Sequence, residues 1–238
     1  MIPSMGSGQA TSMGSRQADW RTWPGLTDYA VAVDAMEVRV AAIRAGSADE
    51  AIWLVEHPAL YTAGTSAEPG DLLDPERLPV IATGRGGKHT WHGPGQRVIY
   101  AMLDLDGRGR DVRAHVSGLE AWIVAALGEC GIAAGTLAGR TGVWVGEAKI
   151  AAIGVRVRRW VTFHGAAINI DPDLGEYRGI RPCGLEAPVT SCAALGNLTP
   201  MAQIDAALHR TADRLIGHAQ LRAAAVQPLG ACTVMNAA

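Results

Sequence analysis

The side chain best suited to take part in a reaction is that of Cys183, within the stretch IRPCGLEAPVTS that spans residues 180–191. It stands between a proline and a glycine, whereas most cysteines pack on apolar faces. Pro182 keeps the backbone before it extended, and Gly184 allows the chain to turn tightly around the sulfur. This setting suits a nucleophile. A free thiol is only slightly ionised near neutral pH, so it would need a cation or a base beside it.

Two side chains elsewhere in the sequence could assist such a thiol. Lys149 follows a predicted hairpin turn at Gly146-Glu147 and lies in an otherwise apolar stretch. Such a lysine either extends its amine into solvent or is partly buried for a purpose, and composition alone favours the first. His164, in FHGAAINI, is the second candidate. Sequence spacing does not show whether either side chain reaches Cys183.

A glycine-rich segment, GRGGKHTWHGPGQ at residues 84–96, is a candidate substrate loop. Glycine lets the backbone approach a ligand closely and exposes N–H groups as donors. The segment matches neither the GxGxxG nor the GxxxxGK[ST] phosphate-binding pattern. His89 and His92 could ligate a metal, but no further ligand follows at metal spacing, so no metal site is expected. A plain surface loop is the alternative interpretation.

Length and composition indicate one domain in a cytoplasmic enzyme. A chain of 238 residues commonly folds as a single α/β domain, and a net charge of −2 gives no reason to expect nucleic acid or an acidic membrane as partner. Four widely spaced cysteines without a CxxC pair indicate reduced thiols. Residues 1–19 lack the regions of a signal peptide and are predicted to be a disordered leader. The domain is expected over 20–218, with a loosely ordered tail at 219–238.

Hydrophobic spacing predicts three helices. The first runs from Thr27 to Gly46, with Thr27 as N-cap and Gly46 as the C-terminal stop. The second covers 112–130 and ends before a glycine, and the last opens at Thr199-Pro200.

The strands are expected mainly in the middle of the chain. Residues 51–55 read as a short buried strand, and 141–170 as a strand-rich region. Within 155–163, apolar residues alternate with arginine and threonine, which predicts half-buried strands. Cys130 and Cys192 lie in apolar surroundings and are expected to pack structurally.

Five stretches, in this order, resemble the signature of the lipoyl(octanoyl) transferases. They cover most of the predicted domain, and their co-linear order makes the resemblance specific. They are VEHPALYTAG (55–64), RGGKHTWHGPGQ (85–96), TGVWVGEAKIAAIG (141–154), FHGAAINI (163–170) and IRPCGLEAPVTS (180–191).

The resemblance implies an α/β (α+β) single domain of the biotin/lipoate ligase-transferase type, with a mixed β-sheet packed against helices. It implies transfer of an octanoyl group from octanoyl-acyl carrier protein, through a cysteine thioester, to a lysine of a lipoyl domain. The implied acceptors are the lipoyl domains of 2-oxoacid dehydrogenases and the glycine cleavage H protein. No cofactor or ATP is implied, because the donor thioester is already activated.

The resemblance also assigns roles to individual residues. It matches Cys183 to the nucleophile, Lys149 to the lysine that favours the ionised sulfur, and His164 to a site histidine of less defined role. His89 occupies a variable position and inherits no role beyond its place in the loop. The substrate-binding set that the resemblance implies consists of Arg85, Gly86, Gly87, Lys88, His89, Thr90, Trp91, His92, Ala152, Ile153, Gly154, Gly165, Ala166 and Ala167.

Two other functions stay open at this point. An ATP-dependent lipoate–protein ligase on the same fold would also place a lysine at the site, but it would not need Cys183. A non-catalytic carrier-protein binding module would need neither Cys183 nor Lys149. The presence of both residues favours the transferase.

Overall fold

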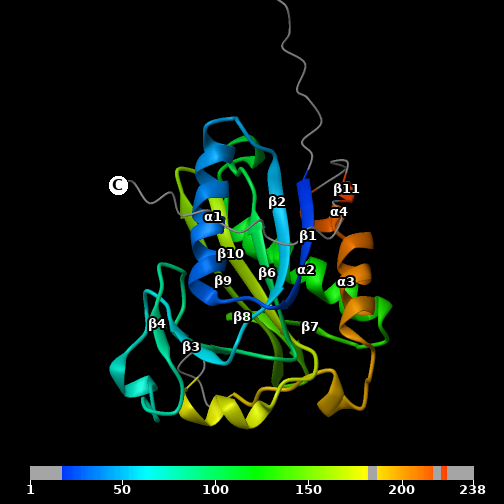
Figure 1. The fold of residues 1–238 in the computed structure, drawn as a ribbon. Helices are drawn as coiled ribbons and strands as arrows, with labels where there is room; N and C mark the ends of the chain where they lie inside the picture. Colours follow the sequence, from blue (N-terminus) through cyan, green and yellow to red (C-terminus); the bar gives the residue numbers. More distant parts are fainter. Residues whose placement is uncertain (1–17, 182–186, 217–220, 224–238) are drawn as a thin grey trace, which may run out of the picture.

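The computed structural model describes residues 18–181, 187–216 and 221–223 (Figure 1). Within these residues the main sheet has eight strands in the order β11-β1-β2-β6-β10-β9-β8-β7. β1 pairs in parallel with β2 and β11, and the other neighbours are antiparallel, so the sheet is mixed. The strands are β1 (Ala18–Leu26), β2 (Glu50–Glu56), β6 (Gln96–Met102), β7 (Gly135–Leu137), β8 (Arg140–Val145), β9 (Ala148–Arg158), β10 (Val161–Asn169) and β11 (Leu221–Ala223).

Helices cover both faces of this sheet (Figure 1). In β2, alternate residues belong to two separate apolar clusters: Ile52 and Leu54 pack with α2 and α3, whereas Trp53 and Val55 pack with α1. The two clusters therefore lie on opposite faces. The helices are α1 (Tyr29–Arg44), α2 (Val112–Glu129), α3 (Met201–Arg210) and α4 (Asp213–Ile216), with short 3-10 turns η1 (Pro69–Asp71), η2 (Asp106–Arg108), η3 (Leu174–Gly179) and η5 (Ala193–Leu195).

A small second sheet carries part of the glycine-rich segment. Its strand order is β4-β3-β5, with β4 at Val80–Ala82, β3 at Leu60–Ala63 and β5 at His89–His92. Antiparallel pairing of β3 with β5 opposes Ala63 to His89 and Leu60 to His92. Part of the predicted loop is thus a strand. None of the helices in the described part of the chain is long and apolar enough to cross a membrane.

The predicted helices are present, with one wrong cap. α1 is capped by Asp28, whose side chain accepts a hydrogen bond from the Val31 N–H at 3.1 Å. Thr27 is not the N-cap, because its own N–H pairs with the Glu56 carbonyl at 2.8 Å and ties the chain to β2. Gly46 has φ +69° and ends the helix as predicted. α3 begins at Met201, directly after the predicted Thr199-Pro200 start.

The strand-rich middle is a long hairpin of β9 and β10. It reverses at Arg159 and Trp160, which have φ values of +48° and +68°. Two consecutive positive φ angles match the twist of a tight hairpin, but Asn-Gly is the sequence that signals it. The prediction of half-buried strands is wrong for β10, which is buried along its whole length. Thr162 satisfies its hydroxyl there by donating to the Ala101 carbonyl at 2.8 Å.

The two described cysteines pack structurally, as expected. Cys192 is fully buried in the apolar core, where burial raises the pKa of its thiol to about 11. Cys130 is half-buried at the end of α2 and packs against the same core. Residues 1–17 of the predicted leader lie outside the described residues. So does the predicted tail, except for 221–223, which form β11.

Candidate active site

A pocket opens over three neighbouring strands on the α1 side of the main sheet. Ala152–Gly154 of β9 pairs residue by residue with Gly165–Ala167 of β10. β6 places Val98 opposite Ala167 and Tyr100 opposite Gly165. Because side chains alternate between faces, the glycines and the outer alanines of these pairs share the face on which Val98 and Tyr100 lie. Small residues therefore leave a hollow in the sheet surface.

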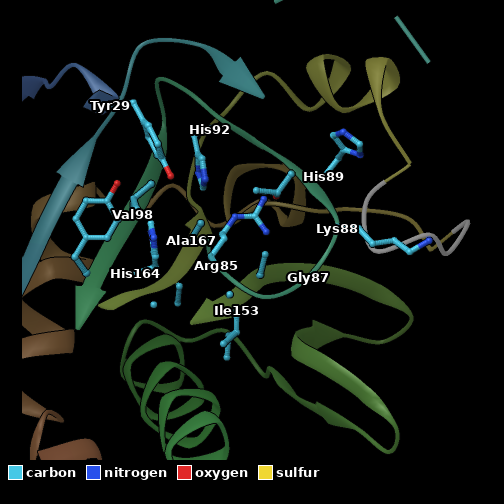
Figure 2. Close-up of a pocket in the computed structure, with 16 residues that line it drawn as sticks. Tyr29, Arg85, Gly87, Lys88, His89, His92, Val98, Ile153, His164 and Ala167 are labelled. Atoms are coloured by element: carbon cyan, nitrogen blue, oxygen red, sulfur yellow. The ribbon is translucent and has the colours of Figure 1, made fainter. Parts of the chain in front are cut away.

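The pocket is completed by α1, by the glycine-rich segment and by β5 (Figure 2). Its empty space, open mouth included, is about 530 Å³. Its lining residues are Tyr29, Arg85, Gly87, Lys88, His89, Thr90, His92, Val98, Tyr100, Ala152, Ile153, Gly154, His164, Gly165, Ala166 and Ala167.

Arg85 places a fixed positive charge in this pocket. Its side chain is buried. Figure 2 shows Arg85 with Tyr29, His92 and His164 on one side and His89 and Lys88 on the other. Nη2 donates to the carbonyl and hydroxyl oxygens of Thr62 at 2.8 and 2.7 Å, and Nη1 donates to the Gly86 carbonyl at 3.0 Å. These hydrogen bonds fix the position of the guanidinium.

The imidazole of His92 is neutral at physiological pH. Burial, with the neighbouring His57 and Arg85, lowers its pKa to about 3. Its Nδ1 lies 2.7 Å from the Gln96 Oε1, while the Gln96 Nε2 contacts the Trp91 carbonyl at 3.2 Å. The amide oxygen therefore faces His92, so Nδ1 is the donor and Nε2 keeps its lone pair.

His164 is also neutral and has a strained backbone. Its φ of +59° lies in the left-handed region, which is uncommon for a residue with a side chain and is often found at functional sites. Burial lowers its pKa to about 4, helped by the charges of Arg85 and Arg156. The ring stacks on Phe163 with centroids 5.4 Å apart. The strain thus brings a neutral imidazole to the pocket wall.

The sequence analysis missed the tyrosines of the pocket. His57 Nδ1 donates to the Thr27 carbonyl at 2.7 Å, so the Tyr100 hydroxyl must donate to His57 Nε2 at 2.8 Å. Burial raises the pKa of Tyr29 to about 12 and that of Tyr100 well above its usual value. Both are uncharged. Tyr29 lies within the helix predicted from Thr27 to Gly46, and no sequence signal distinguishes it from a core residue.

Lys149 is buried rather than extended into solvent. Its Nζ lies 4.7 Å from the ring centroid of Trp144, its cross-strand neighbour in β8. Its N–H donates to the Pro188 carbonyl at 2.8 Å, and its carbonyl accepts from the Thr190 N–H at 2.9 Å. The alternative that composition favoured is therefore wrong, because β9 is covered here by β8 and by residues 188–190.

Lys149 lines a second hollow beside the pocket. The two hollows have four lining residues in common: Gly87, Lys88, Ile153 and Gly154. A group bound in the pocket can therefore be approached from the side of Lys149 across a wall in which two of the four residues are glycine.

Comparison with known proteins identifies the family. Residues 28–212 match the family model of the lipoyl protein ligase A/B catalytic domain. An octanoyltransferase from Rhizorhabdus wittichii is 60% identical over 197 residues, which are 81% of this chain and 88% of that protein. An octanoyltransferase from Maricaulis maris is 58% identical over 199 residues, covering 80% and 88% of the two chains. The chain belongs to the octanoyltransferase family.

Solved structures confirm the fold type expected for this family. A lipoate-protein ligase A bound with ATP superposes with a TM-score of 0.70 at 15% identity, covering 90% of both chains. The putative lipoate protein ligase Ta0514 from T. acidophilum superposes with a TM-score of 0.68 at 14% identity, also over 90% of both chains. At these identities the likeness concerns the fold alone.

The octanoyltransferase fold gathers most of the predicted substrate-binding residues around one pocket. Gly86 and Trp91 do not line it. Gly86 lines the second hollow instead. Trp91 belongs to a separate buried cluster, where its ring packs 5.6 Å from that of Tyr177. His89 lines the pocket, and its buried Nδ1 has no hydrogen-bond partner in the part of the chain described.

Cys183, the predicted nucleophile, lies outside the described residues, but the chain on either side of 182–186 is fixed at the site. The Arg181 N–H donates to the Asp71 carbonyl at 2.7 Å, and an Asp71 carboxylate oxygen accepts from Lys88 Nζ at 2.8 Å. On the other side, Pro188 bonds to Lys149. The two anchors therefore lie at the rim of the pocket and at the second hollow.

Proposed function

We propose that this octanoyltransferase moves an octanoyl group from octanoyl-acyl carrier protein to a lysine of a lipoyl domain, through a thioester on Cys183. The proposed acceptors are the lipoyl domains of 2-oxoacid dehydrogenases and the glycine cleavage H protein, and the proposed location is the cytoplasm. The octanoyltransferase names of its relatives support the acyl group and the reaction. The donor thioester is already activated, so the proposal requires no ATP and no other cofactor.

The observation that carries the proposal is the position of Lys149, which lines the hollow beside the acyl pocket and bonds to Pro188. Cys183 is two residues after Arg181 and five before Pro188 in the sequence. The described residues on both sides of Cys183 in the sequence therefore contact the walls of the proposed site.

The first half-reaction exchanges one thioester for another. The Lys149 ammonium stabilises the Cys183 thiolate, which attacks the octanoyl carbonyl carbon. The carrier's sulfur leaves as a thiolate with the electron pair of its C–S bond and takes up a proton from solvent. The acyl carbon is then bound to Cys183, and the enzyme has lost the negative charge of its thiolate.

The second half-reaction forms the amide. Once Cys183 is acylated, its negative charge no longer holds the Lys149 proton, so Lys149 releases that proton to solvent and its neutral amine can act as a base. The incoming lysine amine attacks the thioester carbonyl carbon and gives a proton to Lys149. The C–S bond breaks, and Cys183 returns as the thiolate beside the restored ammonium.

The pocket offers binding energy for the chain but only modest length selection. Burial of six or seven methylenes contributes roughly 5 kcal/mol, at about 0.8 kcal/mol each. The Ala152 and Ala167 methyl groups and the Val98 side chain supply an apolar surface for it. At about 0.8 kcal/mol, a change of one methylene would alter kcat/KM by roughly 4-fold.

The test is the intact mass of the protein after incubation with octanoyl-acyl carrier protein in the absence of ATP. The wild type should gain one octanoyl group that hydroxylamine removes, and Cys183→Ser should form no thioester. If no adduct forms, and a lipoyl domain is modified only when ATP and free octanoate are supplied, the protein is a ligase. If neither happens, it is a binding module.

A further inference from the structure

The second hollow, on the far side of the shared wall from the acyl pocket, has no role in the proposed reaction beyond holding Lys149. It leads from the molecular surface to Lys149: Arg140 at one end is exposed, whereas Trp144 and Lys149 are buried. Its lining comes from α2, β8, β9 and the glycine-rich segment. The lining residues are Gly86, Gly87, Lys88, Val116, Gly139, Arg140, Thr141, Trp144, Lys149, Ile153, Gly154 and Val155.

One indole ring joins the two ends of this hollow. Lys149 Nζ lies 4.7 Å from the Trp144 ring centroid, and the Arg140 Cζ lies 5.8 Å from the same centroid. Trp144 Nε1 donates to the Arg140 carbonyl at 3.3 Å, which fixes the ring. Cation–π contact of this kind orients a guanidinium without neutralising it. Arg140 is therefore held at the outer end of the hollow by contacts that leave its positive charge available to a ligand.

The cationic side chains around the hollow differ in whether a carboxylate forms an ion pair with them. Lys88, which lines its inner wall, is paired with Asp71 at 2.8 Å and with Glu68 at 3.3 Å. No carboxylate in the described ranges forms an ion pair with Arg140. Glu120 on α2 accepts a hydrogen bond from the Gly142 N–H at 2.8 Å. The outer end therefore suits an anion, and its planar guanidinium suits a phosphate.

We propose that this hollow binds the 4′-phosphopantetheine arm of the acyl donor, with its phosphodiester on Arg140 and its apolar and amide parts along Trp144 and Val116. The inference rests on the proposed function, in which the thioester carbonyl is attacked beside Lys149. The acyl chain then occupies the pocket on one side of the shared wall, and the arm leaves through the hollow on the other. The acceptor's lysine carries a positive charge, which Arg140 repels, so the outer end selects the donor.

The experiment compares octanoyl-phosphopantetheine with octanoyl-pantetheine, which lacks the phosphate, as donors for acyl-enzyme formation. Arg140→Gln should lower kcat/KM for the phosphorylated donor and for octanoyl-acyl carrier protein by about 10-fold, the size of one charge-assisted contact. It should leave octanoyl-pantetheine unchanged, and Arg140→Lys should restore part of the loss. Transfer from preformed acyl-enzyme to a lipoyl domain should also be unaffected. Arg44→Gln, the same charge change at an exposed position ending α1, controls for long-range steering.

Two results would overturn the proposal: equal losses with both small donors, which would mean that Arg140 only supports Trp144, or no loss with either. Binding of the unreactive thioether S-octyl-phosphopantetheine, compared with its dephosphorylated form by calorimetry, gives a second readout that needs no catalysis. Wild type that binds the phosphorylated thioether better, with Arg140→Gln losing that preference, would support the arm site even if no acyl-enzyme formed. Absence of any acyl-enzyme in the wild type contradicts the proposed function and is recognised before any variant is made.

Discussion

Arg85 places a permanent positive charge near two histidines that are neutral at physiological pH. Its charge acts on both His92 and His164, and in each case it lowers the pKa below the value that burial alone would give. Neither imidazole is therefore protonated near pH 7. A carbonyl oxygen that becomes negative in the pocket would find Arg85 as its charged neighbour, with the histidines as neutral polar contacts.

The electrostatic role of Arg85 can be tested by NMR titration. Arg85→Gln should raise the pKa of both His92 and His164, because a positive charge that opposed their protonation is removed. Arg156→Gln is the matched control: Arg156 acts on His164 and is not among the causes of the His92 shift. It should raise the pKa of His164 and leave that of His92 in place. A shift of both histidines in both variants would contradict this division.

Lys149 is expected to act differently in the two half-reactions. Lys149→Arg keeps a positive charge beside the thiol but cannot give up its proton near neutral pH. Acyl-enzyme formation should therefore persist, while transfer to a lipoyl domain should fall by 10²-fold or more, the usual contribution of a general base. Single-turnover measurements of each step separate the two effects. Equal losses in both steps would show that Lys149 has one electrostatic role only.

For single residues, the sequence indicated candidate site residues but not their arrangement in space. Lys149 could be singled out from its apolar surroundings, yet its burial depends on β8 and on residues 188–190, which are distant in sequence. Tyr29 looked like any core residue of an amphipathic helix. Its exposure to the pocket depends on glycines and alanines in other strands, which leave the space beside it.

The paired strands β6, β10 and β9 leave room for the pocket because several of their residues have small side chains or none. Gly165 lies opposite both Tyr100 and Gly154 in the sheet. A Cβ added there would overlap the Ile99 carbonyl oxygen, which belongs to the backbone and cannot move aside without breaking the pairing. Only glycine fits, so the pocket floor and the sheet register are fixed by the same residue.

Gly165→Ala should therefore lower the free energy of unfolding by about 1–3 kcal/mol, the usual cost of overpacking a dense site. It should also reduce acyl-enzyme formation. Gly128→Ala is a suitable control, because an added Cβ at Gly128 meets no atom within 4 Å and the residue is within α2. That change should stabilise by a few tenths to 1 kcal/mol. Urea titration measures both, and a neutral Gly165→Ala would contradict the packing argument.

A substitution in the turn between β9 and β10 is expected to stabilise the folded protein. Arg159 is exposed and has φ +48°, a conformation that asparagine tolerates better than arginine. Arg159→Asn should therefore raise the free energy of unfolding by about 0.5–1 kcal/mol. Arg158→Asn, one residue earlier and still in β9, should give no such gain. If both variants are equally stable, the turn is not strained.

At the scale of elements, the sequence predicted helices better than strand environments. Helices carry their own signals, such as periodic apolar residues and glycine stops, and α1 and α2 end as those signals indicate. The full burial of β10 follows from its central place in the sheet order, with β6 and β9 as neighbours. Which strands flank β10 depends on the tertiary fold, so the alternation of apolar and polar residues within 155–163 could not predict its full burial.

For the whole molecule, buried neutral histidines predict sensitivity to acid. His92, His115 and His164 have native pKa values of about 3, 4 and 4, against about 6.5 in an unfolded chain. Below pH 6.5 the unfolded state takes up protons that the native state does not, so stability falls as the pH decreases toward those native values. Between pH 7 and 5 each histidine should account for roughly 2 kcal/mol of lost stability.

His115 separates this effect from catalysis, because it lies on α2 away from the pocket lining and its buried Nε2 has no partner in the described structure. His115→Leu should reduce the loss between pH 7 and 5 by roughly 2 kcal/mol and leave acyl transfer at pH 7 intact. Chemical denaturation at the two pH values measures this difference. An unchanged pH dependence would mean that His115 is protonated in the native state.

The strand pairing that forms the pocket floor also determines when the pocket can exist during folding. Val98 meets Ala167, and Tyr100 meets Gly165, across a long intervening stretch of chain that includes α2 and β9. Contacts between residues so distant in sequence require closure of a large loop and tend to form slowly. A nascent chain that has emerged only as far as β9 has no floor on which an acyl group could rest. Acyl binding should therefore be among the last properties to appear during refolding, after the helices have formed.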